Sequence, residues 1–164
     1  MNKVTHMKGR ILALWGLITF VFTFFLILIP SLLTYLLPDP LSSRVFTAIA
    51  RLWMNLWLPL VGCPVTVKGK ENFSKGQVYI ITCNHNSLMD VPLSSPFIPG
   101  ANKTIAKISF ARIPIFGWFY RKGSVLVDRR SDSSRKESFV KMKEVLAKGI
   151  HMCIYPEGTR NKTG

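Results

Sequence analysis

Residues 11–29 form an almost wholly apolar run without a charged side chain, which constrains the fold more than any other feature. As a helix, such a run is long enough to cross the roughly 30 Å hydrocarbon core of a bilayer. A cleaved signal peptide is the alternative, but the run exceeds the roughly 7 to 15 apolar residues usual there, and no A-x-A-like site follows. We therefore predict a membrane helix over about 11–29, ended by Pro30 and the turn at 38–40.

A second apolar stretch covers about 45–62 and carries Trp53 and Trp57. Because it also contains Arg51, we expect an interfacial helix, with both indoles at the headgroup level and the Arg51 stem snorkelling along apolar surface. Residues 1–62 are thus predicted to be an N-terminal membrane anchor.

The basic residues around this anchor predict its orientation. Lys3, Lys8 and Arg10 precede it, and Lys68 and Lys70 follow it. The positive-inside bias therefore favours a helical hairpin with both ends in the cytoplasm. The arginine in the intervening turn keeps a single pass open as the alternative. With a hairpin, an active site beyond residue 62 lies on the cytoplasmic face of the membrane, which is the inner membrane if the cell is bacterial.

The charge balance indicates an anionic partner. The sequence has 22 Lys and Arg against 8 Asp and Glu, a net charge of +14, while 48% of its residues are hydrophobic. Lipid is favoured over nucleic acid, because the basic residues are spread along the chain and no zinc-finger, RNP or KH pattern is present. Cys63, Cys83 and Cys153 form no CxxC pair and have no histidine at ligand spacing, so neither a disulfide framework nor a metal site is expected.

Residues 63–164 show the pattern of an α/β domain with flanking helices. Apolar and β-branched runs predict short strands at 65–67, 78–82, 104–106, 124–127 and 152–155. The region of Pro114 and Gly117 reads as a turn. A strand, helix and strand across 124–155 imply a right-handed crossover and a parallel pair, so we expect a mixed, partly parallel sheet.

A helix over about 132–148 is the clearest element of this domain. Ser131 or Asp132 can cap its start, and Gly149 can cap its end. Its apolar face is expected to comprise Phe139, Met142, Val145 and Leu146.

The first polar motif, residues 84–90, follows the predicted strand at 78–82 and contains His85 and Asp90. A tight turn into a helix could bring the Asp90 carboxylate onto one imidazole nitrogen while the other takes a proton, as in a general base. A histidine that only caps a helix or bonds within a loop is the alternative for this motif on its own.

The second motif, residues 155–160, stands just past a strand end, where open α/β sheets bind ligands. Gly158 permits close backbone approach, Thr159 offers a hydroxyl, and Arg160 presents a planar fork suited to phosphate. Glu157 could hold Arg160 in place or accept a substrate hydroxyl. An ordinary polar turn with a surface ion pair is the alternative.

The third motif, residues 123–130, is a predicted buried strand that ends in Arg129 and Arg130. Two adjacent arginines at a strand end could bind phosphate, and they could equally face solvent.

Taken in order, these motifs resemble the first three motif blocks of the 1-acyl-glycerol-3-phosphate acyltransferase (PlsC-like) family. The matching residues are Asn84-His85-(x4)-Asp90, Gly123 to Arg129, and Pro156-Glu157-Gly158-Thr159-Arg160. Ala106-Lys107 and residues 113–118 also look like the family's segment before its second block. The resemblance covers about 65–164, and an N-terminal anchor is compatible with it.

The resemblance implies acyl transfer from acyl-CoA or acyl-carrier protein, as co-substrate and without a cofactor, to the sn-2 hydroxyl of lysophosphatidic acid. The product would be phosphatidic acid. His85 would act as general base and Asp90 would stabilise the charged imidazole. The residues implied to bind the glycerol phosphate are Arg129, Glu157, Gly158, Thr159, Arg160 and, as a further phosphate ligand, Lys107.

Two alternatives to this function stay open. The acceptor could be glycerol 3-phosphate or another lysophospholipid, and the chain could be a non-catalytic basic module that binds membranes. The family's fourth block, an apolar strand with a proline, does not follow Arg160. We therefore expect residues 63–164 to be an acyltransferase domain that is incomplete at its C-terminus.

Overall fold

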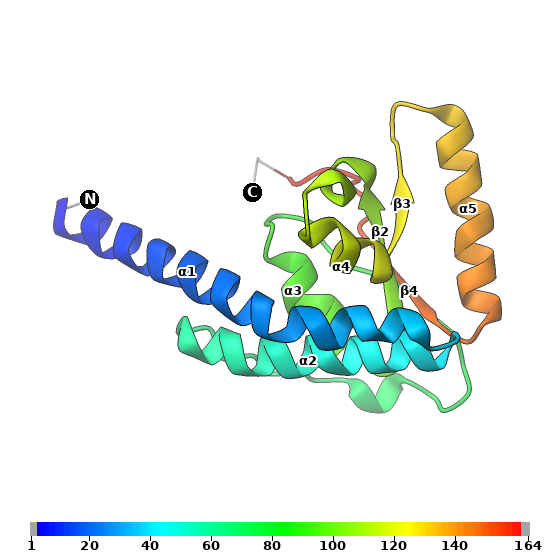
Figure 1. Cartoon of the computed structure of the whole chain (residues 1–164), viewed down its shortest axis with the longest axis horizontal. Coiled ribbons are helices and arrows are strands. Elements are labelled where there is room, and N and C mark those ends of the chain that lie inside the picture. The colour runs from blue at the N-terminus through cyan, green and yellow to red at the C-terminus, as the bar shows by residue number, and fades with distance from the viewer. Residues whose placement is uncertain (1–2, 162–164) are drawn as a thin grey trace.

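A parallel sheet with flanking helices is joined to a long pair of helices that runs along one side of it (Figure 1). The computed structural model describes residues 3–161, and the side chains from residue 7 onward. The first residues of the predicted anchor (1–62) and the last residues of the predicted domain (63–164) therefore lie outside the described residues. The helices are α1 (Lys3–Leu33), α2 (Leu41–Leu60), α3 (Asp90–Ser94), α4 (Phe116–Lys122) and α5 (Asp132–Ala147). The strands are β1 (Ile80–Thr82), β2 (Asn102–Lys107), β3 (Ser124–Val127) and β4 (His151–Ile154).

The four strands lie in the order β1-β4-β2-β3. Each of the three pairings is parallel, with Ile81 opposite Cys153 in the first and Ile105 opposite Val125 in the last. This confirms the α/β class with a partly parallel sheet, and every pairing among the described strands is in fact parallel. The carboxyl ends of all four strands therefore meet at one edge of the sheet.

The predicted strand at 65–67 is wrong. This segment has no regular structure, because no neighbouring strand offers it a hydrogen-bond ladder, and Val65 packs against the helices instead. The expected turn at Pro114 is present, but Gly117 lies inside α4, which the sequence did not predict. There the Gly117 backbone lies against the Ala111 carbonyl, leaving no room for a Cβ.

The chain crosses from β3 through α5 to β4, but these two strands are not neighbours. The predicted direct pair is therefore wrong, since β2 lies between them and bonds to both. The common direction of the two strands is as expected. The sequence shows which two strands a crossover connects. It does not show that an earlier strand, here β2, lies between them in the sheet.

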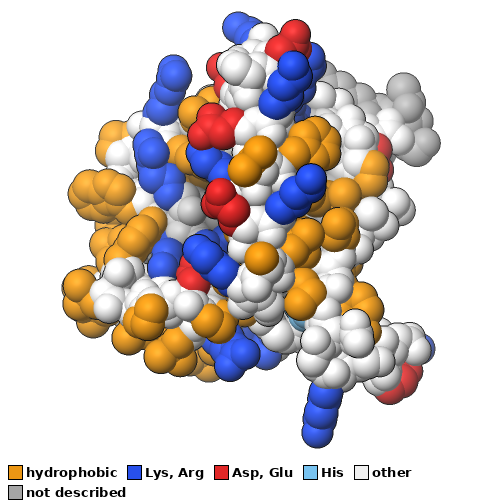
Figure 2. All heavy atoms as spheres, turned by 90° about the vertical axis from the view of Figure 1, so that its right-hand side faces the viewer, with side chains coloured by type: hydrophobic (Ala, Val, Ile, Leu, Met, Phe, Trp, Pro, Cys, Tyr) orange, Lys and Arg blue, Asp and Glu red, His pale blue; other side chains and the backbone are white. Residues whose placement is uncertain are grey.

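Helix α5 covers the sheet on the side shown at the right of Figure 1. The Ser131 hydroxyl caps it by accepting the Ser134 N–H at 3.2 Å, and Met142 and Val145 are buried in the core. Phe139 does not belong to the buried face, as its side chain is 64% exposed. Basic and acidic side chains mingle on the outward face of this helix (Figure 2), including the ion pair Glu137–Lys141 at 2.6 Å.

Helices α1 and α2 lie side by side and run in opposite directions, as a hairpin does (Figure 1). Among the described residues, Met7–Leu36 is the one segment long and apolar enough to cross a membrane by length and composition. We had expected Pro30 to end this helix, but Pro30 lies inside α1. The helix continues to Leu33, because its last turns are held by packing of Phe24 and Leu28 against α2.

The face of α2 that carries Trp53 and Trp57 is buried against α1, so it cannot contact lipid headgroups. Trp53 and Trp57 are 5% and 4% exposed, and their indole N–H groups donate to the hydroxyls of Thr23 and Thr19 at 2.8 and 3.1 Å. The interfacial placement of these two indoles is therefore wrong, because α1 supplies both apolar surface and acceptors.

Arg51 does not snorkel along lipid either. Its guanidinium donates to the backbone carbonyls of Pro96 and Ile98 at 2.6 and 2.8 Å, which ties α2 to the α/β part of the chain. Phe97, between these two carbonyls, joins the hydrophobic cluster of the hairpin. The division of the chain after residue 62 stays a prediction.

Candidate active site

His85 lies in the loop that follows β1, at the carboxyl edge of the sheet. Its Nδ1 is 2.9 Å from Asp90 Oδ2, and the two side chains are 18% and 20% exposed. Among the described residues, Nε2 of this ring has no hydrogen-bond partner. The sequence prediction that the two residues of the first motif form a pair is therefore consistent with the geometry, and the second nitrogen is available to a substrate.

The loop is shaped so that one oxygen of Asp90 collects several donors. Asp90 Oδ2 also accepts the backbone N–H groups of Asn86 and Ser87, at 2.6 and 2.8 Å. Burial by itself would raise the pKa of this carboxyl, but the hydrogen bonds from Ser87, His85 and Asn86 outweigh it and lower the pKa. Asp90 is thus a carboxylate at neutral pH. As a hydrogen-bond acceptor it favours the tautomer of His85 that carries its proton on Nδ1.

Tyr155 supports the imidazole from the neighbouring strand, and the sequence analysis gave it no role. Its ring centroid is 4.7 Å from that of His85. Its hydroxyl lies 2.6 Å from the Ser94 hydroxyl, which in turn donates to the Asp90 carbonyl at 2.7 Å. Burial raises the pKa of Tyr155, so it stays a neutral hydroxyl. Its position directly before Pro156, at a strand end, is the signal that could have identified it.

Glu157 joins the second motif to the first. Its Oε1 accepts the backbone N–H of His85 at 3.2 Å, and the Asn161 N–H donates to the His85 carbonyl at 2.7 Å. Neighbouring strands β1 and β4 thus place the two loops in contact. We had expected Glu157 to hold Arg160 or to accept a substrate hydroxyl, whereas in this structure it holds the backbone of the histidine loop.

The rest of the second motif is an open turn. The Gly158 N–H donates to the Tyr155 carbonyl at 3.0 Å, and Gly158 adopts a φ of +67°, which glycine tolerates best. No atom lies within 4 Å of the position that a Cβ would take there. Thr159 and Arg160 are exposed beside it. Their side chains are therefore accessible to a ligand.

Lys107 and Arg129 stand at the same edge of the sheet but on other strands. Lys107 is the last residue of β2, and Arg129 lies in the turn after β3. Both side chains are exposed. Since neighbouring strands are roughly 4.8 Å apart, Arg129 lies about two strand spacings from the loop after β4. A substrate would have to bridge this distance to contact both sides.

Cys63, Cys83 and Cys153 are free thiols. Among the side chains that the structure describes, no group of three or more His, Cys, Asp or Glu could hold a metal ion. The sulfur atoms of Cys83 and Cys153 are 3.7 Å apart as free thiols, and burial raises the pKa of Cys153 to about 12. The geometry of the histidine and carboxylate pair is suited to moving a proton.

A histidine paired with a carboxylate at the carboxyl edge of a parallel α/β sheet is an arrangement capable of general-base chemistry. The family model described as Acyltransferase matches residues 64–164. The chain therefore belongs to the Acyltransferase family. With the apolar helix α1, this membership indicates membrane association.

Similar proteins are named as acyltransferases. A 1-acyl-sn-glycerol-3-phosphate acyltransferase from Cocos nucifera is 37% identical over 113 residues, which are 68% of this chain and 35% of that protein. One from Borreliella burgdorferi is 35% identical over 117 residues, 68% of this chain and 44% of that protein. The chain thus spans less than half the length of these relatives.

The fold also matches a solved structure. The crystal structure of the 1-acyl-sn-glycerophosphate (LPA) acyltransferase PlsC from Thermotoga maritima superposes with a TM-score of 0.73 and 26% sequence identity. The match covers 96% of this chain and 64% of that chain. It therefore includes the helical hairpin as well as the sheet.

Proposed function

We propose that the protein transfers an acyl group from a thioester, acyl-CoA or acyl-carrier protein, to the sn-2 hydroxyl of lysophosphatidic acid, forming phosphatidic acid. The observation that carries this proposal is the 2.9 Å contact between His85 Nδ1 and Asp90 Oδ2, with Nε2 left open. The names of the relatives support the choice of acceptor.

In the proposed reaction, Nε2 of His85 takes the proton of the acceptor hydroxyl. The oxygen attacks the thioester carbonyl, a C–O bond forms, the C–S bond breaks, and the leaving thiolate receives a proton from the imidazolium. The Asp90 carboxylate stabilises the imidazolium between these steps. General-base catalysis of this kind contributes about 10² to 10⁴ in rate, and positioning contributes further.

The phosphate of the acceptor is proposed to bind the cationic side chains at the carboxyl edge of the sheet. Arg129 and Arg160 approach from the two sides of the edge, Lys107 lies on the strand between, and Gly158 and Thr159 offer backbone and hydroxyl contacts. Arginine suits this role because its planar fork can bind two phosphate oxygens at once.

The hairpin is proposed to hold this edge of the sheet near lipid, with both ends of the hairpin in the cytoplasm. An acceptor with an acyl chain stays in the bilayer, whereas the thioester donor arrives from the aqueous side. The net charge of +14 would attract anionic lipid and the polyanionic donor.

The test is thiol release from an acyl thioester in the presence of lysophosphatidic acid, using the full-length protein and its His85→Ala variant. We expect the variant to lose about 10²-fold or more in rate, while its thermal unfolding stays close to that of the unmodified protein. Glycerol 3-phosphate and other lysophospholipids are tested as competing acceptors. A variant that retains full activity would overturn the general-base role, and a folded protein inactive with every donor would overturn the function.

A further inference from the structure

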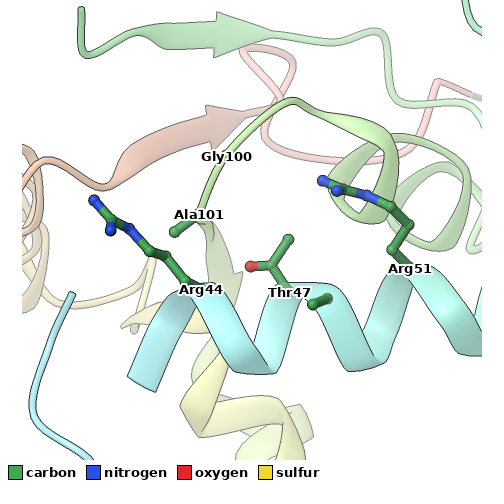
Figure 3. Close-up of a pocket in the computed structure, with 6 residues that line it drawn as sticks. Arg44, Thr47, Arg51, Gly100 and Ala101 are labelled. Atoms are coloured by element: carbon green, nitrogen blue, oxygen red, sulfur yellow. The ribbon is translucent and has the colours of Figure 1, made fainter. Parts of the chain in front are cut away.

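A cavity lies at the opposite edge of the sheet from His85. Its volume is about 230 Å³, and it lies between α2 and the segment that precedes β2 (Figure 3). Its lining residues are Arg44, Thr47, Ala48, Arg51, Gly100 and Ala101. Gly100 and Ala101 stand before the amino end of β2, whereas the histidine loop follows the carboxyl end of β1. The cavity is therefore separate from the site proposed for acyl transfer.

The two arginines give this cavity a positive charge without a balancing carboxylate. None of the six lining residues is acidic, and no ion pair involves Arg44 among the residues that the structure describes. Arg51 is held in place because it donates to the carbonyls of Pro96 and Ile98. These bonds leave other N–H groups of its guanidinium free for a ligand.

Thr47 adds an observation of a different kind. Its side chain is only 4% exposed and stands between the two arginines, with its hydroxyl directed into the gap (Figure 3). No hydrogen-bond partner for this hydroxyl exists in the described part of the chain. Ser31 Oγ is the one buried unpaired side-chain oxygen or nitrogen among the described residues, so the Thr47 hydroxyl is accessible from the cavity and can donate to an anionic ligand there.

The far wall of the cavity is backbone. Gly100 adopts a φ of +84°, and a Cβ at this position would lie 3.0 Å from Nε2 of His151. A larger residue is thus strained at this position.

We propose that this cavity binds the phosphate ester of an anionic phospholipid headgroup. Arginine forks and a hydroxyl are the donors that phosphate oxygens prefer. Arg44 and Arg51 are seven positions apart in α2, about 10 Å along the helix axis, which is longer than one phosphate. Leu41 and Leu52, on the same helix, are 49% and 59% exposed. The surroundings thus suit an amphiphile whose chains lie along exposed leucines.

The proposal is tested by calorimetric titration of the full-length protein in an uncharged detergent. The probes are dihexanoylphosphatidylglycerol and, in a second arm, glycerol 3-phosphate. Arg44→Gln is expected to weaken binding of the lipid about tenfold or more, and Thr47→Val, which keeps the shape of the side chain, a few-fold. The control Lys143→Gln removes the same charge from the exposed face of α5 and is expected to leave the affinity unchanged.

The two arms distinguish the sources of the phosphate. Arg44-dependent binding that is much tighter for the lipid supports a headgroup site, and equal affinity for glycerol 3-phosphate supports a site for a free phosphate ester. The proposal is overturned if neither probe binds, if Arg44→Gln and Thr47→Val bind as the unmodified protein does, or if Lys143→Gln weakens binding equally. No acyl donor is present, so the result is independent of the proposed transferase activity.

Discussion

Asp90 concentrates three hydrogen bonds on a single carboxylate oxygen, and this makes it the most constrained polar side chain of the site. Its donors are the imidazole of His85 and the backbone N–H groups of Asn86 and Ser87. The lowered pKa keeps it charged at any pH at which the imidazole can act as a base. The charge therefore persists when the imidazole takes a proton.

Asp90→Asn is expected to reduce the rate of acyl transfer by about 10² to 10⁴-fold. The amide oxygen can still accept the two backbone N–H groups, but it no longer stabilises an imidazolium by charge. The rate is measured by thiol release under saturating acceptor. Asp132→Asn, on the exposed start of α5, serves as the control. A decrease of less than tenfold would show that the carboxylate charge is dispensable.

Tyr155 allows its ring and its hydroxyl to be tested apart. Tyr155→Phe removes the bond to Ser94 but keeps the ring beside His85, so we expect a loss of roughly 0.5–1.5 kcal/mol in stability and only a small change in kcat. Tyr155→Leu removes the aromatic support and is expected to lower kcat further. Urea unfolding and initial rates measure the two effects. A Phe variant as inactive as His85→Ala would assign the hydroxyl a direct part in the reaction.

At the scale of elements, Glu157 contributes one of the hydrogen bonds between the loops after β1 and β4, beside the bond from the Asn161 N–H to the His85 carbonyl. Glu157→Gln retains an oxygen that can accept the His85 N–H, whereas Glu157→Ala does not. We expect the Gln variant to keep most of its activity and the Ala variant to lose about two- to tenfold. Initial rates at saturating and low acceptor separate kcat from KM. Equal losses in both variants would indicate that the negative charge matters more than the hydrogen bond.

The hairpin is held by a buried face of α2, which Met54 illustrates. Its side chain is 2% exposed, whereas that of Leu52, two residues before it, is 59% exposed. Met54→Ala is expected to lower the free energy of unfolding by about 2–5 kcal/mol, because it leaves a cavity between the helices. Leu52→Ala is the matched control and is expected to have little effect in detergent. Thermal unfolding of the two variants under the same conditions provides the comparison.

At the scale of the whole molecule, we expect the free energy of unfolding to decrease at pH values below the ordinary pKa of histidine, because of His151. This ring is 8% exposed, and its Nδ1 accepts the Tyr79 N–H at 3.1 Å. Burial lowers its pKa, although a hydrogen bond with Pro99 partly opposes the shift. The unfolded chain thus takes up a proton near pH 6.5 while the folded chain resists it. Folding is favoured above this pH and weakens as the pH falls through the window below it.

The measurement is the unfolding midpoint of the protein and of His151→Asn, whose amide oxygen takes the place of Nδ1, on either side of the ordinary histidine pKa of about 6.5. We expect the midpoint of the unmodified protein to decrease more steeply on acidification than that of the variant. The amide oxygen of the variant can still accept the Tyr79 N–H, so its fold is preserved. An identical slope in both proteins would exclude His151 as the source.

Patterns within short stretches of the sequence predicted a large part of this molecule. The apolar helix over 11–29, the capped helix predicted over about 132–148 and the strand at 124–127 follow from residue composition and periodicity and from local signals at Ser131 and Gly149. The spacing of His85 and Asp90 was likewise informative, because five residues of tight turn suffice to bring both side chains together. These features depend on neighbours in the chain, and a sequence displays such neighbours directly.

Only the tertiary structure decided which distant residues meet. Strand β2 lies between β3 and β4, Trp53 and Trp57 bond to α1, and Glu157 holds the backbone of His85. The periodicity of a strand or helix identifies the face that will be buried, but not the element that will cover it. That choice depends on the packing and hydrogen-bond pairing of the whole sheet and hairpin, which link residues as far apart in the chain as Phe24 and Phe119.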